Sequence, residues 1–142
     1  MTENRRWRRP DYHPRYYILD ENRQPVRVRS VEEWARRFES GLGKIVAVNE
    51  FGHEAIGTVK VSTVFLGLDH GFGYLQIDGV TDDRPVLFET MIFAPENDVI
   101  DGHGLNGWME RCCTWDEAVQ MHKRGIEVVK NAFSELAKAS GA

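Results

Sequence analysis

Four side chains in this sequence are candidates for acid–base chemistry: Asp69, His70, Glu89 and His122. Asp69 and His70 directly follow an apolar run, 61–68. An acid next to an imidazole at the end of a buried strand can bind a substrate or a metal, or it can cap the turn that follows. Adjacent strand residues point to opposite faces, so we do not expect these two side chains to bond to each other. Both interpretations of the Asp-His step stay open.

Glu89 and His122 are polar residues at positions whose neighbours are apolar. Glu89 falls on an apolar face of a predicted strand, and His122 lies in the apolar stripe of the predicted C-terminal helix. Because an unpaired buried charge is costly, each residue needs a polar partner. We expect them to pair, with Arg111 and Asp69 as further members. The pair would be a general acid and base, half of a metal site, or a hydrogen-bonded link between helix and sheet.

A ligand site built around these residues would use Ser62, Thr63, Asp69, His70, Glu89, Arg111 and His122. The chain has no phosphate-binding loop motif and no nucleophile elbow. Gly71-Phe72-Gly73 follows a strand but opens no helix, so it is not a dinucleotide fingerprint. The histidines also lack the compact spacing of a metal site. We therefore assign no metal and no cofactor, and we leave open whether any reaction is catalysed.

The only two cysteines, Cys112 and Cys113, are adjacent and come just before a predicted helix. A helix N-terminus lowers the pKa of a thiol, so a reactive cysteine is conceivable, although no base is identified by its spacing. Neighbouring residues of a strand are poor disulfide partners. The absence of a disulfide framework suits a reducing compartment.

Length and charge limit the class of protein. The 142 residues suit one domain, 15–142, preceded by a polar tail, 1–14. The net charge of −4 argues against a general nucleic-acid binder. The tail is the exception, because its basic cluster can contact nucleic acid or an acidic partner, or can simply be solvated. That cluster consists of Arg5, Arg6, Trp7, Arg8 and Arg9. No stretch resembles a signal peptide or a membrane span, so we expect a cytoplasmic protein that does not enter the membrane.

Hydrophobic periodicity predicts an α+β fold. Helices are expected at about 31–40 and about 115–138, each preceded by a capping box that starts at Ser30 or Thr114. Strands are expected at 16–19, 25–28, 44–48, 58–68, 84–94 and 108–113, with a further short one at 74–77. Too few helices separate the strands for parallel crossovers. We therefore predict a mostly antiparallel sheet of five to six strands, with both helices packed on it.

Five segments carry a resemblance to a known family: YYILD at 16–20, WARRFE at 34–39, VSTVFLGLDH at 61–70, LFETMIF at 87–93 and TWDEA at 114–118, the last followed by His122. Together they resemble small uncharacterised proteins that are widespread in phage and prophage genomes. The resemblance implies a phage context, in the cytoplasm of an infected bacterium, but no mechanism. This chain departs from the pattern by an insertion at 74–83 and a longer loop at 95–107.

The phage context leads to three hypotheses. The first is a non-enzymatic accessory protein that binds a host protein or a small nucleotide-like ligand, acting against host defence as a nucleotide-signal sponge or a protein inhibitor. The second is a small hydrolase, with or without a metal, that uses Asp69, His70, Glu89 and His122. The third is a virion structural or assembly protein. We also expect a homo-oligomer, because several aromatic residues look exposed: Trp7, Tyr16, Tyr17, Phe72 and Trp108.

Overall fold

The structure is a computed structural model that describes residues 16–39, 44–70, 75–77, 80–82, 84–96 and 104–140. Its elements are β1 (Tyr16–Leu19), β2 (Pro25–Val28), α2 (Val31–Glu39), β3 (Ile45–His53), β4 (Gly57–Phe65), β5 (Leu75–Ile77), β6 (Val80–Asp82), β7 (Phe88–Phe93), β8 (Met109–Cys112) and α4 (Trp115–Ser140). The fold is α+β, as predicted. The predictions for Arg5, Arg6, Trp7, Arg8, Arg9 and Phe72, and for most of the loop 95–107, fall outside the described residues.

The centre of the molecule is a four-stranded antiparallel sheet in the order β3-β4-β7-β8. The predicted pairing of 58–68 with 84–94 is confirmed, with Thr63 directly opposite Thr90. β3 is longer than the expected 44–48, because it forms a hairpin with β4 through a tight turn. Gly57, at φ +97°, adopts a backbone conformation at this turn that other residues rarely take.

The predicted single sheet is divided in the structure. β1 and β2 form a two-stranded sheet of their own, joined to the chain after β4 by the bridge between Tyr16 and Leu68, and β5 and β6 form a further separate hairpin. β4 ends at Phe65, and the chain then turns through Gly67 at φ +75°. From there it meets the first hairpin, where Tyr17 N donates to Gly67 O at 2.8 Å. The strands therefore fall short of one continuous sheet, because this turn carries the chain out of the β4 ladder before it reaches β1.

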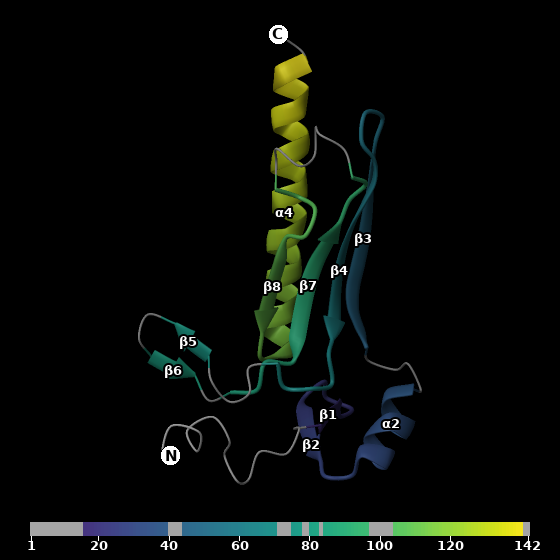
Figure 1. Cartoon of the computed structure of the whole chain (residues 1–142), viewed down its shortest axis with the longest axis vertical. Coiled ribbons are helices and arrows are strands. Elements are labelled where there is room, and N and C mark those ends of the chain that lie inside the picture. The colour runs from purple at the N-terminus through teal and green to yellow at the C-terminus, as the bar shows by residue number, and fades with distance from the viewer. Residues whose placement is uncertain are drawn as a thin grey trace, which may run out of the picture.

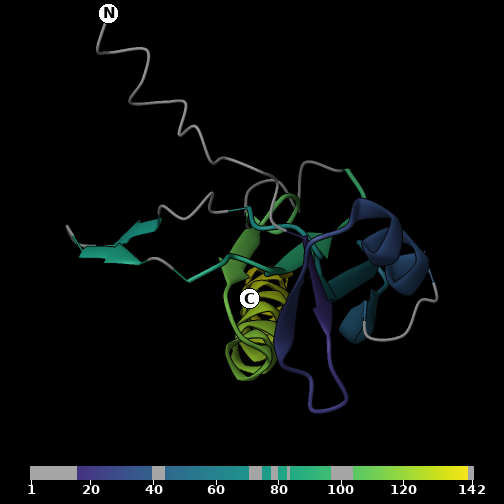
Figure 2. The same ribbon diagram turned by 90° about the horizontal axis from the view of Figure 1, so that it is seen from below.

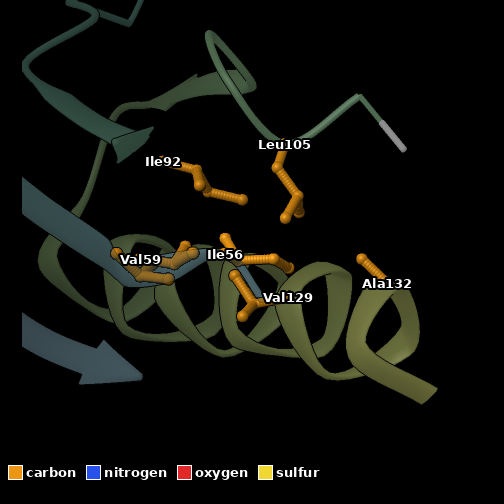
Figure 3. Packing of buried hydrophobic residues seen from close by; sticks show 7 residues of the cluster. Ile56, Val59, Ile92, Leu105, Val129 and Ala132 are labelled. Atoms are coloured by element: carbon orange, nitrogen blue, oxygen red, sulfur yellow. The ribbon is translucent and has the colours of Figure 1, made fainter. Parts of the chain in front are cut away.

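α4 lies along one side of the four strands (Figure 1), and the view from the end of the sheet shows it on that side alone (Figure 2). Alternate residues of β4 and β7 point toward the helix and are buried. Figure 3 shows the cluster that results, with Val59 and Ile92 from the strands and Val129 from α4. Burial of aliphatic side chains on this scale, about 1.5–3 kcal/mol each, is what holds the helix to the sheet.

α2 packs on β1 and β2, at one end of the four-stranded sheet (Figure 1). Its first turn is capped as predicted, because Glu33 N donates to Ser30 Oγ at 3.3 Å. Aromatic rings connect it to the sheet: Trp34 stacks on Phe38 at 4.9 Å between ring centroids, and Phe38 lies 6.3 Å from Phe65. The position of α2 at the end of the sheet, rather than across it, opens a space between helix and strands. None of the described helices is long and apolar enough to cross a membrane.

Candidate functional site

The seven predicted ligand residues are distributed over both faces of the sheet and its end. Thr63 of β4 and His122 of α4 are buried between the helix and the sheet. Ser62 and Glu89 belong to the opposite face, since each is next in sequence to a buried threonine of β4 or β7. Arg111 also lies on that opposite face, and its Nε donates to Glu89 Oε2 at 2.9 Å.

The expected pairing of Glu89 with His122 is therefore wrong. Both faces of β7 carry apolar residues, so the alternation alone did not decide which face the helix covers. α4 covers the face with Phe88, Thr90 and Ile92, which leaves Glu89 on the other side of the sheet. Its partner is the cross-strand neighbour Arg111. This pair satisfies the carboxylate without any contribution from the helix.

His122 is instead the centre of a chain of hydrogen bonds that runs from the buried Thr90 and Thr63 to the exposed Asn49. Its Nδ1 lies 2.7 Å from Thr63 Oγ1, and its Nε2 lies 2.7 Å from Asn49 Oδ1. The Thr63 hydroxyl is also hydrogen-bonded to that of Thr90. The amide oxygen of Asn49 can only accept, so the imidazole carries its proton on Nε2 and accepts at Nδ1 from Thr63. Thr63 in turn accepts from Thr90, and every member of the chain is satisfied.

Burial lowers the pKa of His122 below its usual value of 6.5, so the ring is neutral at pH 7. The order hydroxyl, imidazole, amide is also the order in which a nucleophile, a base and an orienting group stand in some hydrolases. Here, however, Thr63 and Thr90 have no exposed surface at all. In this arrangement a substrate has no access to either hydroxyl, and the hydrogen bonds link the helix to the sheet. Asn49 and Thr90 were not predicted as members, although a threonine on an apolar strand face was a usable signal.

Asp69 and His70 attach the segment that follows β4 to the chain before β7. Asp69 is buried, and its Oδ1 accepts from Val86 N at 2.9 Å. His70 N donates to Val86 O at 2.9 Å. This favours the structural interpretation of the Asp-His step. In the part of the chain that the structure describes, no three His, Cys, Asp or Glu side chains are grouped so that they could hold a metal ion.

Both cysteines are buried: Cys112 is the last residue of β8, and Cys113 follows it. Burial, together with the nearby Glu117 carboxylate and Cys113, raises the pKa of Cys112 to about 12. A thiol with such a pKa carries almost no thiolate at neutral pH, and the thiolate is the reactive form. The effect of the following helix terminus, which suggested a reactive thiol, is outweighed by burial.

A cleft of about 510 Å³ lies where α2 leaves the end of the sheet. It is lined by Ile18, Leu19, Glu33, Arg36, Arg37, Phe38, Lys44 and Phe65. Three of these side chains are cationic and one is acidic, which gives the cleft a charge of +2 in a chain of net charge −4. The basic residues come from the last turn of α2 and from the residue before β3. Sequence reasoning did not single them out, because they meet only through the packing of α2.

The charges of this cleft sit above an apolar floor. Glu33 Oε1 lies 3.4 Å from a terminal nitrogen of Arg37, one turn along α2. Lys44 Nζ lies 4.3 Å from the centroid of the Phe38 ring. A second cleft, of about 520 Å³, lies between the β1–β2 turn and the start of α4. One cation, Arg23, and one acid, Asp116, line it, so it carries no net charge to select an ionic ligand.

Comparison with protein-family models, with curated proteins and with solved structures finds no match. The resemblance to the phage family therefore stays a prediction.

Proposed function

We propose that this protein is a non-enzymatic binding protein for a small anionic, nucleotide-like ligand, held in the cleft between α2 and the end of the sheet. The observation that carries the proposal is the position of Arg36, Arg37 and Lys44 around the rings of Phe38 and Phe65. Arginine and lysine are the usual partners of phosphate, and arginine binds it through two parallel hydrogen bonds. The partly exposed side chains of Leu19 and Phe38 favour the apolar part of the same ligand.

The size of the cleft suits such a ligand. Its volume of about 510 Å³ lies within the range of small-molecule sites, about 300–1,000 Å³. The surplus of positive charge in the cleft distinguishes it from the rest of this acidic chain more clearly than it would in a basic protein. Because the chain as a whole is acidic, it repels anions in general and attracts them only where cations are concentrated.

The lining of the cleft favours binding over hydrolysis. The described residues that line it include no histidine, cysteine, serine or threonine. General-base and nucleophilic catalysis most often use these residue types. A protein that holds a nucleotide without degrading it would act by sequestration. Within the phage context, this is the counter-defence sponge, working in the cytoplasm of the infected host.

Isothermal titration calorimetry tests the proposal. Adenosine monophosphate, a cyclic dinucleotide, adenosine and inorganic phosphate are titrated separately into the protein. We expect a nucleotide to bind more tightly than adenosine or phosphate alone. We expect Arg36→Ala and Lys44→Ala each to weaken that binding about tenfold or more, because each removes a charge-assisted contact of about 1.5–3 kcal/mol.

Lys130→Ala is the matched control, since it removes an exposed positive charge from α4 without changing the cleft. Its affinity should equal that of the wild type. The proposal fails if no nucleotide binds, or if Lys130→Ala weakens binding as much as Lys44→Ala.

A further inference from the structure

The sheet face that α4 does not cover is a regular grid of side chains from all four strands. Its middle row consists of Val48, Ser62, Met91 and Met109, which stand directly opposite one another across β3, β4, β7 and β8. This row contains no charged residue. The row on one side begins with Ile45 and Val64, and the row on the other side ends with Phe93.

This face, which we call the open face, concentrates the exposed apolar surface of the described chain. The described residues include six large hydrophobic side chains that are clearly exposed, and four of them are on it: Ile45, Val48, Phe93 and Met109. Val48, Phe93 and Met109 are each about 45% exposed, and Ile45 is 63% exposed. A contiguous apolar patch on a small domain usually marks a binding surface.

The charges of the open face, which lie in the rows on either side of the middle row, balance. Glu50 stands directly opposite Lys60, and Glu89 is bonded to Arg111. Two acids and two bases give no net charge. Strongly charged partners are therefore not favoured, including nucleic acid and the arginine-rich residues 1–15 of this chain. A neutral, flat, apolar surface is favoured instead, and a second copy of the open face is such a surface.

We propose that two copies of this chain pair through their open faces, sheet against sheet. Face-to-face packing of two antiparallel sheets buries one face of each in a shared core about 10 Å thick. A two-fold axis places the uncharged middle row of each copy against that of the other. The four charged residues lie in the two rows that flank the middle row, where each acid stands directly opposite a base of its own copy.

The area of the open face sets the expected affinity of the dimer. The four strands have nine, nine, six and four residues, so at about 4.8 Å between strands and about 3.4 Å per residue the face covers about 460 Å². Two such faces bury roughly 900 Å², below the range of stable specific interfaces, about 1,200–2,000 Å². The dimer should therefore dissociate in the micromolar range rather than the nanomolar range.

Sedimentation velocity of the full chain, from low micromolar to several hundred micromolar, tests this inference. We expect a reversible monomer–dimer equilibrium for the wild type. Val48→Lys and Met109→Glu should each raise the dissociation constant at least about tenfold, because each buries an unpaired charge in the interface. Both positions are about half exposed, so thermal melts should stay close to that of the wild type.

Val31→Lys is the control, because Val31 is 49% exposed on α2, away from the open face. It should dimerise like the wild type. A wild type that stays monomeric at every concentration overturns the inference, whether the face is left bare or is covered by another segment or by a host protein. Equal dissociation constants for Val48→Lys and the wild type also overturn the inference. Neither result bears on the nucleotide titration, because a monomer can bind the nucleotide as well as a dimer can.

Discussion

At the scale of single residues, the polar groups of the core behave as a connected set rather than as catalysts. His122 accepts from Thr63 and donates to Asn49, and Thr90 completes the chain from the neighbouring strand. A buried polar network of this kind costs little while every group is satisfied. It becomes costly when one member is removed, because the His122 ring and the two threonine hydroxyls are buried and cannot reach water.

Thr63→Val should therefore destabilise the protein by about 1–3 kcal/mol, although it changes the shape of the side chain very little. It leaves the Nδ1 of His122 and the hydroxyl of Thr90 without their shared partner. Urea denaturation measures the loss. Ser62→Ala is the matched control, since it removes a hydroxyl from the adjacent residue on the open face and should change stability by at most about 0.5 kcal/mol. Equal losses in the two variants would contradict the network.

The lowered pKa of His122 has a defined consequence for stability against pH. The folded protein holds the ring neutral, whereas the unfolded chain protonates it near its usual pKa of 6.5. The contribution of His122 is therefore fully present above pH 6.5 and is lost as the pH falls below that value. Urea midpoints of wild type and His122→Gln across this range test the effect. We expect the wild type to lose stability more steeply, and parallel curves would contradict the assignment.

At the scale of elements, the helix and the sheet approach each other through a glycine. A methyl group at Gly125 would come within 2.9 Å of Val61 Cγ1 and 3.3 Å of Thr90 Cγ2. The sequence showed only that glycine weakens the middle of a helix. The structure gives the reason for it, which is the close approach of α4 to β4 and β7.

Gly125→Ala should consequently destabilise the protein, despite the better helix propensity of alanine. Overpacking costs typically about 1–3 kcal/mol, and the propensity gain returns at most about 1 kcal/mol. Gly52→Ala in β3 is the comparison, because nothing lies within 4 Å of the methyl group that it adds. Thermal melts should show a lower Tm for Gly125→Ala and little change for Gly52→Ala. A stabilised Gly125→Ala would show that the contact between α4 and the sheet relaxes freely.

The elements themselves were largely predictable from local signals. The capping hydroxyls of Ser30 and Thr114 mark the starts of α2 and α4, and both bonds are present. Alternation in β4 and β7 predicted their pairing. The covered face of β7 was not predictable, because Leu87 and Met91 make its other side nearly as apolar as the side with Phe88 and Ile92. The misplaced partner of Glu89 follows from this one ambiguity.

At the scale of the whole molecule, an acidic chain assembles one basic cleft. Arg36 and Arg37 stand in the sequence between the acids Glu33 and Glu39, and Lys44 is isolated. Only the packing of α2 on the first hairpin brings them together with Phe65 from the end of β4. Sequence reasoning located the obvious basic cluster at residues 5–9 and missed this one, because a surface made of distant segments has no linear signal.

Binding of a nucleotide in this cleft and nowhere else on the protein can be followed by an NMR titration. Adenosine monophosphate is added to ¹⁵N-labelled protein while the backbone amide signals are followed. The account predicts that the largest shifts belong to Ile18, Leu19, Phe38, Lys44 and Phe65, which line the cleft from four different elements or their ends. Shifts centred instead on the second cleft, at Arg23 and Trp115, or no shifts at all, would contradict it.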